Sequence, residues 1–548
     1  MTVEARRPRP GASMGRILRA PSAHVLIATQ LQESGLAYLR ARPGARLTLL
    51  PGMARGEFLA ALADADALIV RSELQVDEEA LTHAPLLKVI GRAGIGVDNI
   101  DLDRATQRGV LVVNAPRENI DSAAEHTFAL LLAVARRIPA SDVALKGGRW
   151  ERDALGRELL GRTLGLAGLG KVGSRVARMA QGFGMEVVAY DPYVAPEQFR
   201  RAEVREAASL EELLAQADVV SLHVPRIPGS GPLLDRARIE LLKPGAILLN
   251  TSRGALIDEQ ALYERLRDGH LFGAGLDVWA VEPSAGTALQ RLPNVVATPH
   301  LGASTEEAQE RVALTIAVQV WKGLADEPVD YPVNLPYVEA ELASRIMPWA
   351  VLGEKMGALL AQVIEGSPRS LEIAYGGELA DVRVDRLRGA VLKGLMARVT
   401  DENVNFVNAE ALTREHGIEV LERRDPVRAS FVSTLTARVR FGEAAVSVTG
   451  TLFDGERPRI VDVDGFEMEF PPEENLLLMR WWDRPGVLGR VGTALGEAGV
   501  NVARLELSRT RPGRRALAVI STDTPAGAEL VERLARLESV VSVRAVRL

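Results

Sequence analysis

The sequence predicts an α/β protein built mainly from doubly wound parallel sheets. Between residues 24 and 298, short β-rich runs alternate with helical stretches, which is typical of parallel strands joined by crossover helices. A glycine-rich turn joins one of these runs to the helix after it. Residues 476–548 follow a different order, strand-helix-strand-strand-helix-strand, which predicts a small α+β domain at the end of the chain.

The first alternating series begins after a tail, residues 1–23, that is rich in Arg, Pro and Gly and for which we expect disorder. The tail lacks the apolar segment of a secretory signal, and Met14 is a second candidate for the start of translation. Residues 121–137 predict one long helix that is apolar on most faces and should be buried in a core or a subunit contact. Strands are expected at 24–28, 67–70, 87–90 and 110–113.

A second alternating series follows this helix. Its strands are expected at 163–167, 186–190, 219–224, 246–250, 273–277 and 295–298. Prolines at 328, 332 and 336 indicate a linker, and Pro471-Pro472 indicates a second boundary. These breaks divide the remaining chain into a mixed α+β region at 337–472 and a last domain at 473–548.

The composition is that of an ordinary globular protein, with 47% hydrophobic and 25% charged residues. A net charge of −6 gives no indication of nucleic acid or an anionic membrane as a partner, and the apolar runs are too short to span a bilayer. The chain has no cysteine, which excludes disulfides, thiolate metal ligands and cysteine nucleophiles. We therefore expect a cytoplasmic protein without a metal site.

The glycine-rich turn has the full context of a Rossmann-type dinucleotide site. In Gly168-Leu-Gly-Lys-Val-Gly173 the first glycine permits a tight turn, Gly170 lets the backbone approach a pyrophosphate, and Gly173 allows close packing of helix on strand. Asp191 ends the next strand, where a carboxylate can accept hydrogen bonds from ribose hydroxyls and repels a 2′-phosphate. The alternative is a glycine-rich turn that binds nothing, but the strand, helix and acid together favour NAD as the cofactor.

Oxidation of a secondary alcohol by such a cofactor needs a base for the hydroxyl proton and a cation for the substrate. Among the seven histidines, His223 and His300 end strands at the edge where α/β sheets bind ligands. A following Val-Pro restricts the reach of His223, whereas His300 lies between a proline and a Leu-Gly pair, and we favour His300 as the base. We interpret His126, inside the apolar helix, as a core or interface residue.

Two further strand ends offer partners for this base. Arg253 lies beside a glycine that lets a ligand come near, and Glu282 follows the next strand. A hydrogen bond from His300 to Glu282 would favour the imidazolium form, so that the pair could work near neutrality. Each charge alone is typical of a solvated surface, but an arginine, an acid and a histidine at three strand ends of one dinucleotide fold indicate an active site.

These residues resemble the D-isomer-specific 2-hydroxyacid dehydrogenases. The matching motifs are Gly168-Leu-Gly-Lys-Val-Gly173, Asn250-Thr-Ser-Arg-Gly-Ala-Leu-Ile-Asp-Glu259, Gly275-Leu-Asp-Val278, Glu282-Pro283 and Thr298-Pro-His-Leu-Gly-Ala-Ser-Thr305. The resemblance implies that Arg253 holds the substrate, Glu282 tunes the base and His300 moves the proton. It also implies a flavodoxin-like substrate domain that is split into 24–118 and 308–336, with the nucleotide domain, 119–307, inserted. NAD contacts are expected from Gly168, Gly170, Lys171, Val172, Gly173, Asp191, Val224, Thr251, Ser252, Asp277, Gly302 and Ala303.

The closer resemblance within this family is to the D-3-phosphoglycerate dehydrogenases, and it covers nearly the whole chain after the tail. It rests on the segments 91–99, 114–116, 122–126 and 135–139, and on 404–409 and 448–452 in an intervening domain of the long bacterial form. The phosphate of such a substrate favours arginine forks and hydroxyls. Substrate contacts are therefore expected from Arg71, Ser72, Gly94, Ile95, Arg136 and Arg137. The last two would come from a neighbouring subunit of a homodimer or homotetramer, and isoleucine at 95 and valine at 224 replace threonines found in relatives.

The C-terminal unit resembles an ACT domain, a ferredoxin-like module that senses amino acids. Asp483 and Asn501 match positions that hold serine in the family's regulatory interface, so L-serine is the expected effector. Trp481 stands where a tyrosine often occurs, which removes one hydroxyl contact. The alternative is a module that only dimerises.

The expected reaction is therefore the NAD-dependent oxidation of D-3-phosphoglycerate to 3-phosphooxypyruvate, the first step of phosphorylated serine biosynthesis. One alternative is another D-2-hydroxyacid dehydrogenase, such as a hydroxypyruvate, glyoxylate or D-lactate reductase. The other is a non-catalytic, corepressor-like protein that binds NAD as a switch. The additional C-terminal residues argue against the first alternative, and the ACT unit argues against the second.

Overall fold

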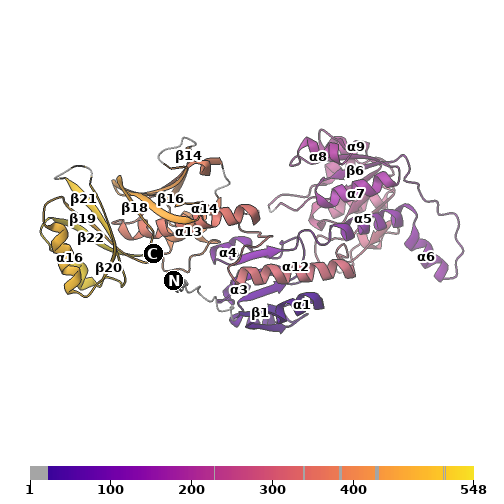
Figure 1. The fold of residues 1–548 in the computed structure, drawn as a ribbon. Coiled ribbons are helices and arrows are strands. Elements are labelled where there is room, and N and C mark those ends of the chain that lie inside the picture. Colours follow the sequence, from indigo (N-terminus) through magenta and orange to yellow (C-terminus); the bar gives the residue numbers. More distant parts are fainter. Residues whose placement is uncertain are drawn as a thin grey trace, which may run out of the picture.

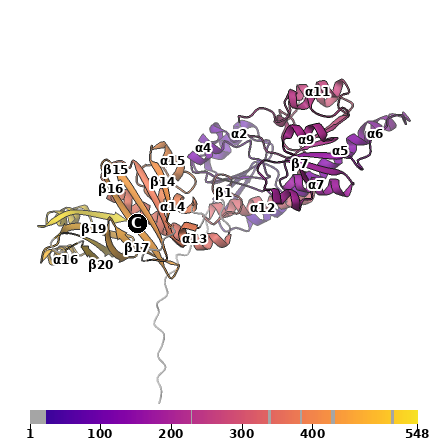
Figure 2. The same cartoon turned by 90° about the horizontal axis from the view of Figure 1, so that it is seen from above.

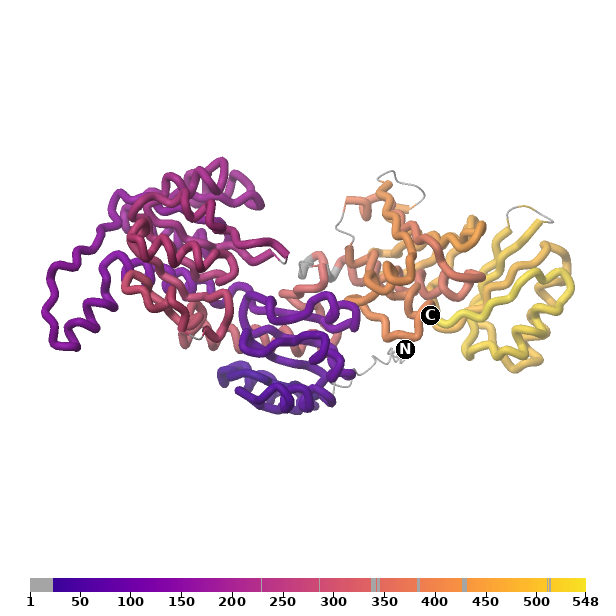
Figure 3. The backbone as a smooth tube through the Cα atoms, turned by 180° about the vertical axis from the view of Figure 1, so that it is seen from behind, coloured from indigo at the N-terminus to yellow at the C-terminus, as the bar shows by residue number. Residues whose placement is uncertain are grey.

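The computed structural model describes residues 23–548 apart from 228, 285, 337–339, 382–384, 426–430, 510, 512 and 513. The tail expected at 1–23 lies outside the described residues, except for Ala23, which begins the first strand. Four structural units follow one another in a row (Figures 1 and 3). No helix in the described part of the chain combines the length and the apolar character needed to cross a membrane.

The first unit is a five-stranded parallel sheet with the strand order β2-β1-β3-β4-β5, which is the flavodoxin-like order. Its strands are β1 (Ala23–Ile27), β2 (Ala45–Leu49), β3 (Ala67–Val70), β4 (Val89–Arg92) and β5 (Leu111–Asn114). Its helices are α1 (Glu33–Arg40), α2 (Arg55–Ala61), α3 (Glu78–Thr82), α4 (Leu102–Gln107) and, from much later in the chain, α12 (Glu306–Leu324). Helix α12 buries Val312, Ile316 and Val320 in the core of this sheet, so the chain leaves the unit after β5 and returns to it through α12.

The second unit is a seven-stranded parallel sheet with the order β12-β11-β10-β9-β6-β7-β8. Its strands are β6 (Thr163–Ala167), β7 (Glu186–Tyr190), β8 (Arg205–Glu206), β9 (Val219–Leu222), β10 (Ile247–Asn250), β11 (Gly273–Leu276) and β12 (Val295–Ala297). Its helices are α5 (Ile120–Ala135), α7 (Lys171–Gly182), α8 (Pro196–Arg201), α9 (Leu210–Gln216), α10 (Arg236–Glu240) and α11 (Glu259–Arg267). A further helix, α6 (Ile138–Lys146), projects as an arm at the far end of the molecule (Figure 2).

The Rossmann-type and flavodoxin-like sheets confirm the fold class that the alternating pattern predicts. Every strand expected in the two series is present, although several begin or end one or two residues away. Two strands, β2 and β8, were not predicted. Each is the edge strand of its sheet and is exposed or half-buried, so neither needs the continuous apolar run that marks a central strand.

The third unit is a mixed six-stranded sheet with the order β14-β13-β15-β16-β17-β18 and helices that cover it. Its strands are β13 (Ser370–Gly377), β14 (Glu419–Asp425), β15 (Ser433–Phe441), β16 (Ala444–Phe453), β17 (Arg457–Val463) and β18 (Phe466–Phe470), and its helices are α13 (Ala340–Val363), α14 (Asp385–Met396) and α15 (Ala409–Glu415). Asn405 of this unit donates a hydrogen bond of 2.7 Å from Nδ2 to the carbonyl oxygen of Gly109 in the first unit.

The fourth unit is an antiparallel sheet with the order β20-β21-β19-β22 and two helices, which confirms the predicted ferredoxin-like order. Its elements are β19 (Asn475–Trp482), α16 (Val487–Glu497), β20 (Val502–Arg509), β21 (Arg515–Thr522), α17 (Ala528–Ala535) and β22 (Val540–Arg547). One face of this sheet joins the core of the third unit through Leu476, Leu478, Leu517, Val519 and Val546. The two C-terminal units therefore share one hydrophobic core and cannot be separated without exposing it.

Candidate active site

The glycine-rich turn lies at the switch point of the second sheet, where β6 is flanked by β7 and β9. Gly168 has a φ of 101°, and a Cβ there would lie 2.5 Å from the carbonyl oxygen of His223. A Cβ at Gly173 would lie 2.2 Å from the carbonyl oxygen of Gly168, so helix α7 can approach the turn only through a glycine. A Cβ at Gly170 would meet nothing within 4 Å, so the backbone at the start of α7 is open to a pyrophosphate.

Asp191 lies directly after β7, beside this turn. Its Oδ2 accepts a hydrogen bond of 2.9 Å from the N–H of Leu169, and its Oδ1 accepts one of 3.0 Å from the N–H of Tyr193. Each carboxylate oxygen can accept more than one hydrogen bond, so the group is fixed in place and can still receive ribose hydroxyls. The arrangement fits NAD and disfavours a 2′-phosphate at this point.

Replacement of Asp191 by alanine is expected to weaken NAD binding and to narrow the preference for NAD over NADP, because a 2′-phosphate would no longer meet a carboxylate. The measurement is the dissociation constant of both reduced cofactors by fluorescence titration. Glu186→Gln, at the exposed opposite end of the same strand, serves as the control for loss of a negative charge. A wild-type protein that prefers NADP would contradict the proposed role of Asp191.

The other residues expected at the cofactor surround the turn. Lys171 and Val172 form the first positions of α7, and Val224 lies against Gly168, with its Cγ1 2.9 Å from the position of a Cβ there. His223 is held by a contact of 2.9 Å between its Nε2 and the Oγ of Ser221. Burial lowers the pKa of His223 to about 4, which makes this histidine a weak proton acceptor and a poor candidate for the base.

His300 and Glu282 form a hydrogen-bonded pair at the neighbouring strand ends. The Nδ1 of His300 lies 2.7 Å from the Oε2 of Glu282, and the Oε1 of Glu282 accepts from the N–H of Trp279 at 3.0 Å. Burial opposes ionisation of Glu282, but the hydrogen bonds from His300 and Trp279 hold its pKa below the ordinary value. An ionised Glu282 can only accept, so Nδ1 carries a proton and Nε2 is left as the acceptor. This is the arrangement of a general base.

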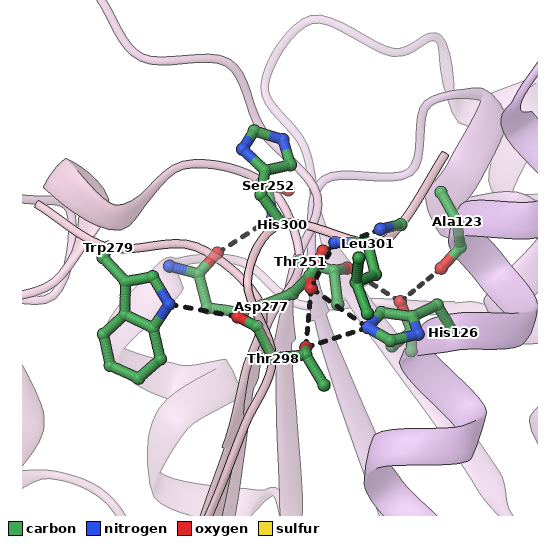
Figure 4. A network of polar contacts seen from close by, with 12 residues as sticks. Ala123, His126, Thr251, Ser252, Asp277, Trp279, Thr298, His300 and Leu301 are labelled. Carbon is green, nitrogen blue, oxygen red and sulfur yellow. Dashed lines mark hydrogen bonds and ion pairs between the residues drawn. The ribbon is translucent and has the colours of Figure 1, made fainter. Parts of the chain in front are cut away.

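Asp277 follows β11 and is completely buried, and Figure 4 draws it with His300 in one network of polar contacts. Its carboxylate accepts hydrogen bonds from the Oγ1 of Thr298 at 2.6 Å and from the N–H groups of Leu301 and Gly302 at 2.7 and 2.8 Å. Burial alone would raise the pKa of Asp277, but the hydrogen bonds from His126, Thr298 and the Leu301 N–H lower it to about 2. Its oxygens are largely taken by protein donors, so Asp277 acts on the cofactor surface mainly by fixing the loop that contains Gly302.

The loop after β10 is fixed in a similar way. Ser252 donates from Oγ to the carbonyl oxygen of Leu222 at 2.7 Å, and the Oγ1 of Thr251 lies 2.8 Å from the Oγ1 of Thr127 on α5. Ala303, in the loop after β12, is held through its carbonyl oxygen by the Nε2 of Gln309 at 2.6 Å. The expected cofactor residues on these two loops therefore have defined positions at the carboxyl edge of the sheet.

Arg253 reaches from this edge toward the first unit. Its Nε lies 2.7 Å from the Oδ2 of Asp98, and its guanidinium passes so close to Gly96 that a Cβ there would lie 1.6 Å from a guanidinium nitrogen. Arg92 lies at the end of β4, near Arg253 and Arg71. Burial is the largest cause that lowers the pKa of Arg92 to about 10, and the positive charges of Arg253 and Arg71 lower it further. Burial also lowers the pKa of Arg71. Arg71, Arg92 and Arg253 therefore concentrate positive charge where the first two units meet.

Arg92 is a residue that the sequence analysis missed, although it lies in a segment that was singled out. Strand β4 pairs with β3 so that Val70 lies opposite Arg92, which brings Arg71 and Arg92 to the same edge. The other expected substrate residues lie on the loops after these two strands. Ser72 is exposed, and the exposed Ile95 has its carbonyl oxygen fixed by the Nδ2 of Asn114 at 2.6 Å. Gly94 has a φ of 146° and lies directly against the Arg92 guanidinium.

Arg136 and Arg137 lie apart from the other expected substrate residues within one chain. Arg137 is the N-cap of α6 and Arg136 precedes it, and this helix projects from the end of the second unit that lies away from the first unit (Figure 1). The Arg137 guanidinium lies 5.1 Å from the centre of the Phe272 ring. Any contact of these arginines with a substrate would have to be made in another subunit.

Asp483 and Asn501 lie at opposite ends of the C-terminal sheet. Asp483 pairs with Arg509, at the end of β20, at 2.9 Å, whereas Asn501 precedes β20 and donates to the Oδ2 of Asp523 at 2.6 Å. The strand between them has 8 residues, which corresponds to roughly 25 Å. Trp481 is buried in the core beneath α16 and α17, so its indole does not line a surface site in this chain.

Three family models match the chain. They describe the NAD-binding domain of D-isomer-specific 2-hydroxyacid dehydrogenases at residues 128–302, the D-3-phosphoglycerate dehydrogenase intervening domain at 345–464 and the ACT domain at 483–539. Among solved structures, the TT0316 protein of Thermus thermophilus is 41% identical with a TM-score of 0.53, and it covers 57% of this chain and 99% of its own. D-Lactate dehydrogenase of Aquifex aeolicus, in complex with NAD and lactic acid, is 31% identical with a TM-score of 0.51, over 57% and 99% of the two chains.

Curated relatives match over almost the full length. D-3-phosphoglycerate dehydrogenase of Mycobacterium tuberculosis is 42% identical over 509 residues, which cover 91% of this chain and 95% of the relative. The enzyme of the same name from Methanocaldococcus jannaschii is 37% identical over 525 residues, 96% and 99% of the two chains. The chain is therefore an NAD-dependent dehydrogenase that belongs to the D-3-phosphoglycerate dehydrogenases, in the long form with an intervening and an ACT domain, within the D-isomer-specific 2-hydroxyacid dehydrogenase family.

Proposed function

We propose that this protein oxidises D-3-phosphoglycerate at C2 to 3-phosphooxypyruvate with reduction of NAD. The observation that supports this proposal is the proximity of Arg71, Arg92 and Arg253 to one another, together with the His300–Glu282 pair at the carboxyl edge of the second sheet. A substrate with a carboxylate and a phosphate at its two ends requires this much positive charge. The names of the full-length relatives support the same substrate.

In the proposed reaction each residue of the site has a separate role. Arg253 binds the carboxylate beside C2, while Arg71 and Arg92 hold the phosphate. His300 accepts the C2 hydroxyl proton on Nε2, and Glu282 stabilises the resulting imidazolium through the 2.7 Å hydrogen bond. When bound, NAD supplies the hydride acceptor. The products are 3-phosphooxypyruvate, NADH and a proton that His300 releases to solvent.

Glu282→Gln is expected to move the acid limb of the kcat/KM profile for oxidation to lower pH. The glutamine cannot stabilise the imidazolium as a carboxylate does, so His300 would lose its proton more easily and remain a neutral base at lower pH. The maximal rate should also fall, because charge formed on His300 during the reaction is less well stabilised. An unmoved pH profile would mean that Glu282 does not act through His300.

The protein would work as a homo-oligomer. The α6 arm and the residues after it expose Val143, Trp150 and Leu155, the last two to about 80% of their surface. Large apolar side chains gathered on one projection are typical of a surface that a partner covers. A second copy of the chain would also bring Arg136 and Arg137 to a neighbouring site. The division of the chain into a split substrate domain, an inserted nucleotide domain and two regulatory domains belongs to the same proposal.

L-Serine is the proposed effector of the C-terminal unit. Because Asp483 and Asn501 are at opposite ends of one sheet, they can bind a single amino acid only if two ACT sheets meet. Binding would then favour one quaternary state, since an effector shifts an equilibrium by its differential affinity for the two states.

We expect L-serine to inhibit turnover, with a coupling of about 5- to 150-fold, and Asp483→Ala to abolish inhibition while basal turnover is kept. Glu532→Gln, an exposed change on α17, is the control. Initial rates with increasing serine, together with the molecular mass from light scattering, provide the measurement. Absence of both inhibition and serine binding in the wild type would favour a module that only dimerises. A truncation control should end near residue 336, because a cut at 476 exposes the core shared by the last two units.

A further inference from the structure

One histidine close to the proposed base has no part in the reaction described above. His126, in the middle of α5, directs its Nε2 toward two residues of the second sheet (Figure 4). This nitrogen lies 3.1 Å from the Oδ1 of Asp277 and 3.0 Å from the Oγ1 of Thr298. The side chain of His126 is only 19% exposed, so the contact is made in a largely dry environment. Helical periodicity alone would place His126 in the core, but its polar atom is aimed at the active-site loop.

Asp277 holds three consecutive residues of that loop. Its backbone carbonyl oxygen accepts from the N–H of His300 at 2.8 Å, its Oδ1 from Leu301 at 2.7 Å and its Oδ2 from Gly302 at 2.8 Å. His300 itself has a φ of 57°, a left-handed conformation that residues other than glycine rarely adopt without external support. The orientation of the proposed base is therefore set by where the Asp277 carboxylate is held.

The direction of each hydrogen bond around Asp277 can be assigned. An ionised carboxylate only accepts, and the single hydroxyl proton of Thr298 goes to Asp277, since their oxygens are 2.6 Å apart. His126 must then be the donor through Nε2–H, which fixes its tautomer. With Asp277 completely buried, each donor compensates part of the cost of keeping a charge away from water.

The next residue of α5 makes an equivalent contact on the other active-site loop. The Oγ1 of Thr127 lies 2.8 Å from the Oγ1 of Thr251, two residues before Arg253. Helix α5 thus touches both the loop of the proposed base and the loop of the proposed substrate arginine through adjacent side chains. Its first residue, Ile120, is also where the chain enters the second unit from the first.

We propose that His126 is a positioning residue for proton transfer: by donating to Asp277 it holds the loop of His300 in its left-handed, base-presenting conformation. The inference rests on the proposed role of His300. His126 would not contact the substrate, and its effect would be transmitted through the Asp277 carboxylate to the backbone of residues 300–302.

The test compares His126→Leu, which keeps an apolar side chain but has no donor, with His126→Gln, whose amide can donate from a similar distance along the side chain. Leucine is expected to lower kcat roughly 10-fold or more, because a displaced base loses its alignment. The melting temperature is expected to fall, because the buried Asp277 carboxylate loses one donor, and rates are therefore compared at a temperature at which both proteins are folded. Glutamine is expected to restore most of kcat. Glu125→Gln, the exposed preceding residue of α5, should behave as the wild type.

A second measurement needs no substrate. Hydrogen–deuterium exchange of a peptide covering 296–304 should be faster in His126→Leu than in the wild type, and the glutamine should reverse this. Unchanged kcat and unchanged exchange in the leucine variant would overturn the proposal, as would faster exchange without loss of kcat. If the wild type does not oxidise D-3-phosphoglycerate, the proposed substrate is wrong. The same variants are then compared on whichever 2-hydroxy acid the wild type oxidises, so a wrong substrate can be distinguished from a wrong role for His126.

Discussion

Replacement of His300 by alanine is expected to lower kcat for oxidation by roughly 100-fold or more, which is the usual scale for loss of an acid–base group. The structure supports a large effect, because the Glu282 carboxylate fixes Nδ1 as a donor and leaves Nε2 as the only ring acceptor. NADH binding, measured by fluorescence titration, should change little, because His300 is not among the residues around the glycine-rich turn. A second histidine variant, His83→Ala at the exposed C-cap of α3, controls for removal of an imidazole. Near-normal kcat in His300→Ala would reject His300 as the base.

The second large loss of kcat/KM is expected when Arg253 or Arg92 is replaced, and the loss in the Arg92 variant should depend on the substrate. Arg253→Gln should lower kcat/KM by about 100-fold or more for every 2-hydroxy acid, because hydrogen bonds to charged groups contribute about 1.5–3 kcal/mol each and Arg253 would lose a bidentate pair. Arg92→Gln should lower kcat/KM for D-3-phosphoglycerate by a similar factor, and it should lower kcat/KM for a phosphate-free 2-hydroxy acid much less. In the proposed binding mode only the first substrate has a phosphate for Arg71 and Arg92 to bind.

Steady-state kinetics with both substrates on each variant would measure this difference. Arg236→Gln, an exposed arginine on α10 that pairs with Glu264, is the matched control and should leave both substrates unaffected. Equal losses on the two substrates in Arg92→Gln would show that Arg92 does not distinguish the phosphate. If Arg92→Gln lowered only the stability of the fold and the folded fraction kept a normal kcat/KM, Arg92 would not be a substrate-binding residue.

Much of the architecture was accessible from the sequence, because alternation of short apolar runs and helices admits few topologies. The approach of Glu282 to His300 could be anticipated as well: both follow parallel strands, whose carboxyl ends meet at one edge of the sheet. The place of Arg92 among the candidate site residues could not be predicted in the same way, because its position beside Arg71 depends on the pairing of β3 with β4. Pairing order is a long-range property that no local pattern reports.

Two other features required the three-dimensional structure for different reasons. His126 occupies a helix whose periodicity describes only which faces are apolar, and not where the polar end of a half-buried ring points. Asp483 and Asn501 match effector positions one by one, but the antiparallel topology of the sheet separates them within one chain. The return of the chain to the first sheet through α12 was implied by family resemblance and not by any local signal.

The most direct test of the central claim is the rate of NADH formation when the purified full-length protein is given D-3-phosphoglycerate and NAD. The account predicts turnover that depends on both compounds, a higher kcat/KM for D-3-phosphoglycerate than for D-lactate, D-glycerate or glycolate, and a strong preference for NAD over NADP. Turnover that favours a phosphate-free hydroxy acid would contradict the proposed use of Arg71 and Arg92. Tight NADH binding without measurable turnover of any of these acids would show that the candidate site is not a working active site.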